Sequence, residues 1–588
     1  MTDAPRLAGT IVDALRWRRD HEPDAVALVS PDGAETTCRQ WYDRALVAAY
    51  GLVARGVRPG DPVLLVADDR HWSDFAVSYV GVLLAGGVAV PVPVALYPAI
   101  AATPQPLLGA VTVRHGELQV PDGPWPVVAD LDLAGHPEAP SPLPELHGSD
   151  PAEISFTAGT EGPPKAVLSS HDTLTVRYTA EESPSQPGDG SGYLLVLPFG
   201  NTFAHTVFID AMQTPGARLY VAGGFRPEDF VDRLCRAPIE VTFLVPAMVE
   251  ALLRTPDLPW DKAGPVEVVC VSGAPVRAEA LAYLGQVLPH ATVVNSYCST
   301  EAWPAGTDWA YTPDEAVNAG RPWECREVRV IAGDGTIAAP GDTGRVQLRT
   351  RGVRARRTVA LSGRLPALGP DAVAAWVGTD DLGFLDDHGR LHLIGRRGDV
   401  FTVGGLQIAP AQLEAVLLRH PAVRDAVVLP SPHPSLGAIP VALVVPSGEV
   451  TRRELLRVVI DEVGADRAPR AVYFVPAVPR SAAGKVVRAD AAELLARVRR
   501  VEAALRDEAT VVSYLAGVVA ELVNGVEAPD GWTNFFEHGG DSLAALRLCR
   551  RIKSDYGVAV QAREVAENPA LRDLAEVVTE QLRRAEDR

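Results

Sequence analysis

Strand-like and helical segments alternate through the first 310 residues of the chain, and this alternation limits the folds open to it. Short apolar runs predict strands at 25–29, 62–67, 193–197, 218–222, 241–245, 266–271 and 292–294. Amphipathic segments predict helices at 11–19, 46–54, 75–85 and 227–235. Strands that alternate with helices form a sheet covered by helices, so we expect an α/β fold here.

The pattern changes further along the chain. Residues 328–350 alternate around Asp-Gly and Pro-Gly turns, which is typical of β-hairpins. A small α+β unit is expected after Gly395, and the last segment has the apolar stripes of a helical bundle. A chain of 588 residues is too long for one hydrophobic core. We therefore expect a large N-terminal core of α/β layers with a β subdomain at 1–397, a small α+β subdomain at 398–497, a linker at 498–510 and an all-α bundle at 511–588.

Charge and cysteine usage narrow the class of function. The net charge is −19, whereas nucleic acid and acidic membranes attract basic surfaces, so neither is an expected partner. Six cysteines are scattered without a CxxC pair, as in a protein with reduced thiols. The N-terminus lacks the pattern of a signal peptide, and glycines and prolines interrupt the apolar stretch 75–94. A cytoplasmic protein is therefore expected.

A loop rich in glycine, threonine and proline follows an apolar run at 154–156. From residue 157 its sequence is TAGTEGPPK. Glycine allows backbone N–H groups to approach phosphate oxygens closely, and Lys165 at the end of the loop adds a positive charge. The spacing is not that of a Walker A loop, and such a composition is also typical of a plain surface turn. The motifs that follow decide between these interpretations.

Four further motifs follow in order: NSYCSTE at 295–301, TDDLG at 379–383, GRRGD at 395–399 and PRSAAGKVVR at 479–488. Together with the glycine-rich loop, this series resembles adenylate-forming enzymes, which include acyl-CoA synthetases, luciferases and nonribosomal peptide synthetase adenylation domains. The resemblance covers residues 1–497. It implies a large and a small adenylation subdomain that use ATP and Mg²⁺.

The resemblance also implies roles for single residues. Tyr297 would stack on adenine, Thr300 would contact the α-phosphate, and Glu301 would hold Mg²⁺ through the hard oxygen ligand that this cation prefers. Asp381 and Arg396 would contact the ribose. An ammonium at Lys485 would stabilise charge during attack on the α-phosphorus. The complete implied set is Thr157, Gly159, Thr160, Gly162, Lys165, Ser296, Tyr297, Thr300, Glu301, Asp381, Arg396 and Lys485.

Four positions depart from the motifs of the family. Ala158 stands where the family often has serine, and Glu161 where it often has threonine. Asp380 replaces the glycine of a Thr-Gly-Asp motif, which is expected to alter the local turn. The hinge position of the family, usually Asp or Lys, falls on Gly398, and glycine predicts a looser hinge.

The segment FFEHGGDSLAAL near the C-terminus has a signature of its own. Asp541 is placed to cap a helix, and two glycines before it turn the chain so that Ser542 stands at the helix tip. Leu543, Leu546 and Ile552 are expected to share the core face of that helix. Read alone, Ser542 would be an ordinary residue at a helix start. In this order and place, the segment resembles a carrier-protein site, which implies that 4′-phosphopantetheine is attached covalently to Ser542.

Family members that activate amino acids place an aspartate at the mouth of the acyl pocket, where it pairs with the α-ammonium. Counting back from Pro215-Gly216-Ala217 puts that position near Phe203, and residues 198–208 contain no aspartate. A buried ammonium without a partner is costly, so we expect an aryl or compact hydrophobic acid. Asn201 could orient a hydroxyl or amine on it, whereas a lone histidine here is more often structural. The implied pocket is Asn201, Phe203, Ala204, His205, Val207, Cys270, Ser272 and Pro304.

The whole chain is thus similar to an adenylation–carrier didomain of natural-product biosynthesis. The resemblance implies that a carboxylate attacks the α-phosphate of ATP to form acyl-AMP. The small subdomain would then rotate at Gly398, and the pantetheine thiol would take the acyl group as a thioester. Implied partners are a small-molecule carboxylic acid, a phosphopantetheinyl transferase and a downstream synthase or transferase. The need for an accessory activator protein is left open.

Two other hypotheses stay open. The didomain could activate an α- or β-amino acid whose ammonium is anchored elsewhere, for example by Asp210. A hypothesis of another class is a degenerate adenylation scaffold beside a working carrier, which the departures at 158, 161 and 380 suggest. The charged residues retained in the motifs favour the enzyme.

Overall fold

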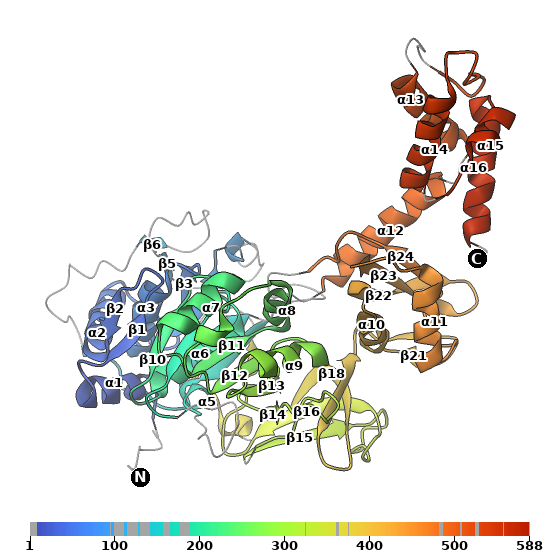
Figure 1. Ribbon diagram of the computed structural model, residues 1–588. Coiled ribbons are helices and arrows are strands. Elements are labelled where there is room, and N and C mark those ends of the chain that lie inside the picture. Colours follow the sequence, from blue (N-terminus) through green and yellow to red (C-terminus); the bar gives the residue numbers. More distant parts are fainter. Residues whose placement is uncertain are drawn as a thin grey trace. The chain divides into compact units, whose positions relative to one another are not determined.

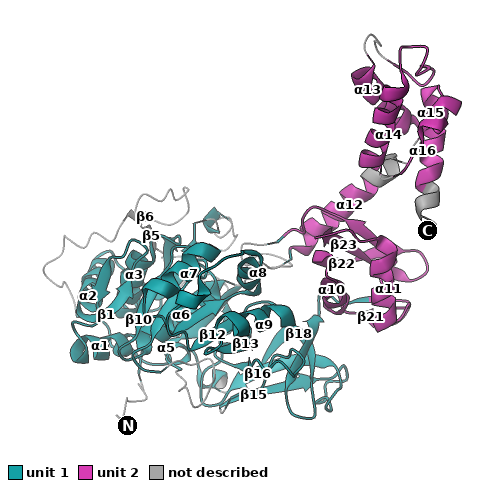
Figure 2. Ribbon diagram, viewed as in Figure 1, with its two compact units in different colours: residues 1–401, 480–486 teal, residues 402–479, 487–588 magenta. Residues whose placement is uncertain are grey.

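The computed structural model describes residues 9–94, 96–98, 111–114, 127–129, 142–156, 165–176, 188–323, 325–359, 364–373, 375–480, 486–505, 508–523, 529–556 and 558–586. The chain divides into two compact units (Figure 2). The first consists of Met1–Phe401 with Arg480–Val486, and the second of Thr402–Pro479 with Val487–Arg588.

An eight-stranded sheet forms one layer of the first unit. Its strands are β1 (Val26–Val29), β2 (Glu35–Thr37), β9 (Gly192–Leu195), β10 (Arg218–Val221), β11 (Val241–Leu244), β12 (Val268–Ser272), β13 (Thr292–Cys298) and β14 (Gly306–Ala310). The order is β14-β13-β12-β11-β9-β10-β1-β2. The strands from β13 to β1 pair in parallel, and Ser272 of β12 lies opposite Ser296 of β13. Neighbouring parallel strands therefore bring side chains near their C-terminal ends to one edge of the sheet.

A seven-stranded sheet forms the second layer. Its strands are β3 (Pro62–Ala67), β4 (Val88–Pro93), β5 (Val111–Arg114), β6 (Val127–Ala129), β7 (Pro151–Phe156), β8 (Ala166–Ser170) and β17 (Arg357–Val359). The order is β17-β8-β7-β4-β3-β5-β6. The antiparallel pair β7 and β8, with Phe156 opposite Ala166, flanks the glycine-rich loop.

Helices of the first unit pack on these sheets (Figure 1). They are α1 (Ile11–His21), α2 (Cys38–Ala54), α3 (Trp72–Leu84), α5 (His171–Leu174), α6 (Thr202–Gln213), α7 (Pro227–Arg236), α8 (Pro246–Arg254) and α9 (Ala278–Val287). Nearly every residue of α3 is buried because the helix contacts α2, β3 and β4. Its Phe75 packs 4.9 Å from Phe199, and its Trp72 packs 5.8 Å from Phe208 of α6, between ring centroids. An aromatic core therefore lies beside α6.

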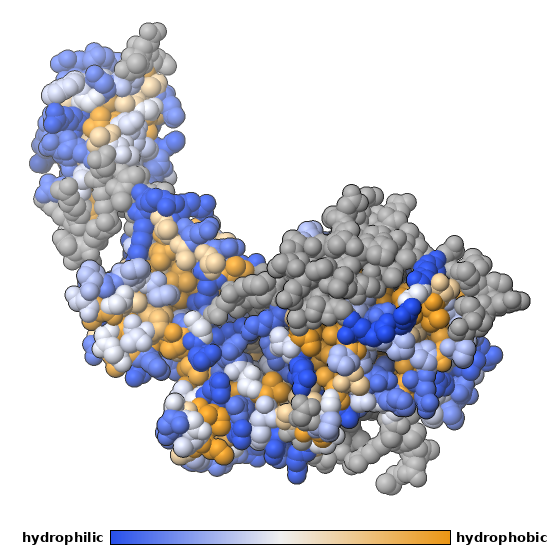
Figure 3. Space-filling model, turned by 180° about the vertical axis from the view of Figure 1, so that it is seen from behind, coloured by the Kyte–Doolittle hydropathy of each residue, from blue (hydrophilic) through white to orange (hydrophobic). Residues whose placement is uncertain are grey.

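A four-stranded antiparallel sheet completes the first unit. It consists of β15 (Arg326–Ile331), β16 (Gly344–Thr350), β18 (Val377–Leu385) and β19 (Leu391–Arg396), in the order β15-β16-β18-β19. The β-hairpin predicted at 328–350 is confirmed by the β15–β16 pair. The guanidinium carbons of Arg329 and Arg349 lie 4.2 and 4.4 Å from a ring centroid of Trp376, which is cation–π distance. On the face seen in Figure 3, hydrophobic residues are exposed in small patches between polar ones.

The second unit has an α+β part and a helical part. The first part contains β20 (Phe401–Val403), β21 (Leu406–Ile408), α10 (Pro410–Leu418), β22 (Val423–His433), β23 (Gly437–Pro446), α11 (Arg452–Val463) and β24 (Ala471–Phe474). The second contains α12 (Arg488–Leu505), α13 (Glu508–Leu522), α14 (Ser542–Tyr556), α15 (Ala562–Glu567) and α16 (Leu571–Glu586). A separate hydrophobic cluster of α13, α14, α15 and α16 residues holds the helical part together.

The α/β class expected from the sequence is confirmed, with differences in single elements. The helix predicted from residue 46 begins at Cys38, because Thr37 and Gln40 form a capping box that the apolar pattern does not reveal. The helices α6, α8 and α9 were not predicted. Helix α6 is buried along most of its length, so no clear polar stripe marks it. Helices α8 and α9 are short, with nine and ten residues. Helix α12 runs across the boundary proposed at residue 497. Within the described residues, no helix is both long and apolar enough to cross a membrane.

Candidate active site

Tyr297, Asp381 and Arg396 form one polar group although they are distant in the sequence. Tyr297 on β13 donates a hydrogen bond from its hydroxyl to Asp381 Oδ2 at 2.7 Å. Burial, and then the charge of Asp381, raises the pKa of Tyr297 well above its usual value, so the phenol stays a neutral donor. Arg396 lies opposite Asp381 in the β18–β19 pair, with its Nε 3.6 Å from Asp381 Oδ1. The group therefore places a hydrogen-bond acceptor (the Asp381 carboxylate) and cationic donors (the Arg396 guanidinium) beside the aromatic ring of Tyr297.

The loop after β13 carries Thr300 and Glu301. A hydrogen bond of 2.9 Å from the Trp303 amide to Ser299 O closes its first turn. Thr300 Oγ1 lies 3.4 Å from Thr202 Oγ1 at the start of α6, and the Glu301 side chain is half-buried. Hydroxyls from a loop and from a helix N-terminus therefore meet where phosphate oxygens could accept hydrogen bonds.

Lys165 has an acidic neighbour that its motif did not predict. Its Nζ lies 3.5 Å from Asp380 Oδ2, and each of the two side chains is 56% exposed. The expectation that Asp380 alters a turn is wrong, because residue 380 lies inside β18 and its carbonyl accepts a backbone hydrogen bond from Arg397. The change from glycine therefore adds a carboxylate beside Lys165.

Five predicted residues lie outside the described part of the chain. They are Thr157, Gly159, Thr160 and Gly162 in the glycine-rich loop, and Lys485. The positions 158 and 161 also lie there. Their roles stay predictions. Gly398, the predicted hinge, lies in the turn that follows β19.

The predicted acyl segment forms the first turns of α6. Asn201 is its N-cap, and its Oδ1 accepts a hydrogen bond from Phe203 N at 3.0 Å. Phe203 packs edge-on against Phe243 of β11, with ring centroids 5.5 Å apart. Ala204 and Val207 are buried on the same helix. The surface beside Phe203 is therefore aromatic and apolar, and the amide group of Asn201 is the polar group at its edge.

The ends of β12 and β13 add small residues to this region. Ser272 Oγ donates a hydrogen bond to Ser296 O at 2.8 Å, and Cys270 is buried two residues earlier. Burial raises the pKa of the Cys270 thiol well above its usual value, so it stays protonated. Pro304, in the loop after β13, is also buried. All six cysteines are free thiols, and each is buried or half-buried.

His205 belongs to the aromatic core described above. Its ring lies 5.6 Å from Trp72, 5.3 Å from Phe75 and 5.4 Å from Phe199, between centroids. Neither ring nitrogen has a hydrogen-bond partner among the residues described. Burial lowers the pKa of His205, so the ring is neutral. These contacts support the structural interpretation of this histidine over a substrate contact.

Ser542 is the first residue of α14 and is exposed. Asp541 caps this helix as expected, because its Oδ1 accepts a hydrogen bond from Ala544 N at 2.7 Å. A Cβ on Gly540 would come within 2.6 Å of Phe535, so glycine is needed for the close approach of the turn. The two preceding glycines thus present a serine hydroxyl at a helix tip.

The core face of α14 differs from the expected one. Ile552 is buried as predicted, but it shares its face with Ala545, Leu548 and Cys549. Leu543 and Leu546 are 57% and 52% exposed, so their assignment to that face is wrong. Helical spacing of three and four residues back from Ile552 selects Cys549, Leu548 and Ala545 instead.

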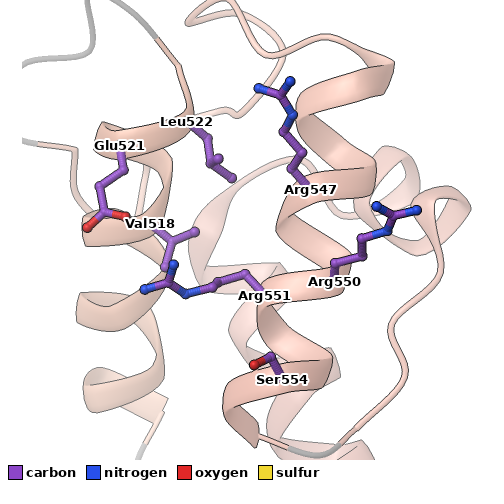
Figure 4. Close-up of a pocket in the computed structure, with 7 residues that line it drawn as sticks. All are labelled: Val518, Glu521, Leu522, Arg547, Arg550, Arg551 and Ser554. Carbon is purple, nitrogen blue, oxygen red and sulfur yellow. The ribbon is translucent and has the colours of Figure 1, made fainter.

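A shallow groove of about 290 Å³ lies between α13 and α14 (Figure 4). Arg547, Arg550 and Arg551 project from α14, and Arg551 extends towards α13, which carries Glu521. In a chain with a net charge of −19, this face of the helix that begins at Ser542 is basic.

Three polar residues near the motifs were missed by sequence reasoning. Arg356, which is 6% exposed, donates a hydrogen bond to Thr300 O, and Glu153 is a fully buried carboxylate on β7. The third is Asp380, as the neighbour of Lys165. Nothing in the local sequence marks the first two, because burial of a charge depends on distant partners.

Three families match successive parts of the chain. Residues 15–355 match the AMP-binding enzymes, residues 412–485 the AMP-binding enzyme C-terminal domain, and residues 513–578 the phosphopantetheine attachment site.

Single relatives span most of the chain. It is similar to 4-coumarate–CoA ligase-like 3 of Oryza sativa subsp. japonica, with 27% identity over 523 residues that cover 79% of this chain and 85% of the relative. The chain is also similar to the phosphinothricin tripeptide synthetase PhsB of Streptomyces viridochromogenes, with 29% identity over 602 residues that cover 98% of this chain and half (50%) of PhsB. ATP-bound MatB from Rhodopseudomonas palustris shares the fold, with a TM-score of 0.67, 21% identity, and coverage of 82% of this chain and 98% of MatB.

Proposed function

The chain belongs to the AMP-binding enzyme family, and on this premise we propose that it activates a carboxylic acid as an acyl adenylate and loads it onto its own carrier domain. The family's C-terminal domain and a phosphopantetheine attachment site follow the AMP-binding region in the same chain. The protein is therefore an ATP-dependent adenylate-forming ligase fused to a carrier domain. The acid, the transfer to Ser542 and the pathway are the parts that we propose.

The residues around Tyr297 fit the sugar and base of ATP. We expect its ring to stack on adenine while Asp381 accepts hydrogen bonds from the ribose hydroxyls and Arg396 donates to them. The support is the hydrogen bond and the close carboxylate–guanidinium approach that hold these three side chains together. Ser296, in the same strand, is expected to contact the nucleotide as well.

Glu301 is the group we expect to hold Mg²⁺. Proteins usually bind Mg²⁺ through one or two carboxylates together with substrate phosphates and water, and a half-buried glutamate next to the Thr300 hydroxyl suits that mode. Bound there, Mg²⁺ would neutralise charge on the leaving pyrophosphate. Within the described residues no group of three or more His, Cys, Asp or Glu side chains could hold a metal by itself.

In the first half-reaction, an oxygen of the substrate carboxylate attacks the α-phosphorus, and the bond from that phosphorus to pyrophosphate breaks. Thr300, Lys165 and the glycine-rich loop, with Thr157, Gly159, Thr160 and Gly162, bind the phosphates. The Lys485 ammonium is proposed to stabilise the charge that develops on the carboxylate and phosphate oxygens. The ordered motifs support these assignments.

The acid is proposed to be aryl or compact and hydrophobic. The expected position of an anchoring aspartate falls near Phe203, which packs on Phe243, and Ala204 and Val207 add further apolar surface. The Asn201 amide, which is partly used in capping, could still orient a hydroxyl or amine. Asp210 gives no support to an amino-acid anchor, because its Oδ2 already accepts a hydrogen bond from the Tyr193 hydroxyl at 3.0 Å.

Ser542 is proposed to carry 4′-phosphopantetheine, whose thiol would attack the acyl carbonyl of acyl-AMP, so that a thioester forms and AMP is released. Its hydroxyl is exposed at a helix tip, where a phosphopantetheinyl transferase could reach it. For the second half-reaction we propose that the small subdomain rotates at Gly398. A downstream synthase or transferase would then take the thioester, in a natural-product pathway of the kind that the name of PhsB suggests.

Acid-dependent ATP–pyrophosphate exchange tests the proposed substrate class. The panel consists of aryl acids, short aliphatic acids, β-amino acids and the proteinogenic amino acids. We expect exchange with acids that lack an α-amino group. Strong exchange with one α-amino acid would contradict the proposed acyl pocket, but it would still agree with an adenylate-forming enzyme.

Transfer is tested on the same protein after treatment with a phosphopantetheinyl transferase. The intact mass should increase by the prosthetic group and then by the acyl group. The Ser542→Ala variant should keep full exchange and lose both increases, whereas Ser554→Ala, on the same helix, should keep them. Silence of the folded protein across the whole panel would favour the scaffold hypothesis.

A further inference from the structure

Arg356 is a buried arginine, whereas of the nearby arginines at 354 and 357 the first forms an ion pair and the second has an exposed side chain. Arg354 forms an ion pair with Asp172, and the Arg357 side chain is exposed at the start of β17. The Arg356 side chain is only 6% exposed. Removal of a guanidinium from water is costly unless partners compensate for it, so the partners of Arg356 indicate what it does.

Arg356 makes two contacts with the loop after β13. Its Nη1 donates a hydrogen bond to Thr300 O at 3.0 Å. Its guanidinium carbon lies 4.6 Å from the ring centroid of Trp303, which is a cation–π geometry. Thr300 and Trp303 enclose Glu301 in the sequence, so one buried cation holds both sides of the residue proposed to bind Mg²⁺.

A buried carboxylate balances this charge. Glu153, on β7 at the foot of the glycine-rich loop, is fully buried and accepts hydrogen bonds from Tyr79 at 2.8 Å and from Ser155 at 2.6 Å. Burial lowers the pKa of Arg356, and the charge of Glu153 is the strongest of those that raise it, with Glu301 also contributing. The Arg356 charge therefore acts on a structural carboxylate and on the carboxylate of the loop.

We propose that Arg356 is a positioning residue for adenylation: from the seven-stranded sheet it holds the Ser299–Pro304 loop, and with it Thr300 and Glu301, in the arrangement that receives Mg²⁺ and the phosphates. Glu153 keeps the buried cation neutralised. The inference rests on the proposed function of Thr300 and Glu301. Its structural content, the restraint of the loop by Arg356, applies to the protein without any ligand.

A positioning role and a merely structural role predict different behaviour for a variant in which the charges of both Arg356 and Glu153 are removed. Arg356→Met removes the loop contact and also leaves Glu153 buried without its cation, so the protein loses stability. In the double variant Glu153→Gln/Arg356→Met, the uncompensated charge is absent, and most of that stability should return. Under the proposal the loop stays unrestrained in the double variant, whereas a purely structural role predicts full recovery.

The first measurement is hydrogen–deuterium exchange on the ligand-free full chain. In Arg356→Met and in the double variant, amides of residues 299–305 should exchange about tenfold faster or more than in the wild type, and exchange in β7, which carries Glu153, should recover in the double variant. Arg357→Met is the matched control, because this exposed neighbour should leave the loop unchanged. Recovery of slow loop exchange in the double variant would overturn the proposal.

The second measurement is binding and kinetics with Mg·ATP. Calorimetric titration should give about tenfold weaker binding of Mg·ATP to the double variant, and pyrophosphate exchange should slow at saturating Mg·ATP and acid. Wild-type affinity and rate in the double variant would contradict the proposal. If the wild type shows pyrophosphate exchange with none of the acids in the panel, the proposed function fails. The ligand-free measurement still decides whether Arg356 restrains the loop.

Discussion

At the scale of single residues, Asp380 shows how a departure from a motif acquires meaning only from its neighbours. The motif alone predicted a changed turn. In the structure, the carboxylate lies beside Lys165, at the entrance to β8, and within 4.0 Å of Arg397. The lysine proposed to bind phosphate is therefore engaged by an anion when no nucleotide is present, and ATP has to compete with that anion.

We expect Asp380→Asn to lower the KM for Mg·ATP. An exposed ion pair contributes up to about 1 kcal/mol, so release of Lys165 should improve the KM by about two- to fivefold. Pyrophosphate exchange at varied Mg·ATP measures this. Asp387→Asn, an exposed aspartate in the loop after β18, should change nothing, and a higher KM in Asp380→Asn would contradict the interpretation.

His171 predicts an acid-sensitive stability. Its side chain is 1% exposed, and burial lowers the pKa of His171 from 6.5 to about 4. Between these values the unfolded chain binds a proton that the folded chain does not, so stability falls as the pH drops from 6.5 towards 4. The loss from this one group is at most about 3 kcal/mol.

His171→Phe should therefore flatten the decrease of urea midpoint with falling pH. The ring keeps its shape and loses its titration, while the exposed His290, changed to Phe, serves as the control. Buried His205 would account for part of the slope that remains, because burial lowers its pKa as well. An unchanged slope in His171→Phe would show that the histidine does not contribute.

At the scale of elements, α14 illustrates which face of a helix the sequence can assign. Asp541 and the glycines marked its start correctly, since capping depends on residues within one turn. Its buried face was predicted wrongly, because Leu543 and Leu546 are apolar and were assigned to the core. Trp532, Leu543 and Leu546 are instead among the exposed large hydrophobic residues, which suits a surface that other proteins contact.

A matched pair of leucines tests this face. Leu548→Ala should destabilise the helical part by about 2 to 5 kcal/mol, because Leu548 is fully buried among the residues of that core. Leu546→Ala should change stability by about 0.5 kcal/mol or less. Hydrogen exchange of α13 and α16 amides in the full chain measures both. Equal effects of the two substitutions would contradict the assigned face.

The sequence was informative wherever a pattern is local. Alternating strands and the hairpin at β15–β16 follow from periodicity, and both were predicted. The short helix α6 was not, although it carries the proposed acyl residues, because nearly all its sides are covered. The pair Arg356 and Glu153 could not be predicted either, since segments far apart in the sequence have to fold before the charge of Glu153 acts on Arg356.

At the scale of the whole molecule, the chain returns to its first unit for Arg480–Val486 after forming most of the small α+β part. Lys485 falls in that segment and outside the described residues. Boundaries at 397 and 497 remain predictions, and the helix α12 continues past the second one. Adenylation and attachment of the prosthetic group can nevertheless be tested separately, because the matched AMP-binding regions and the matched attachment region are different parts of the chain.

Lys485→Ala should separate them experimentally. We expect acid-dependent pyrophosphate exchange to fall by about 10² or more, as for loss of one charge-stabilising group. Attachment of phosphopantetheine to Ser542, followed by intact mass, should proceed as in the wild type. Normal exchange in this variant would mean that the lysine has been assigned wrongly.

The state of the cysteines has a practical consequence for labelling chemistry. The six free thiols are buried or half-buried, and burial raises the pKa of Cys38, Cys270 and Cys549. Because the thiolate is the reactive form, these groups should alkylate slowly at neutral pH. A pantetheine thiol on exposed Ser542 would alkylate fast, and an acylated one would not. The fast phase of maleimide uptake would therefore count the primed carriers that hold no acyl group, without radioactivity or a known acid.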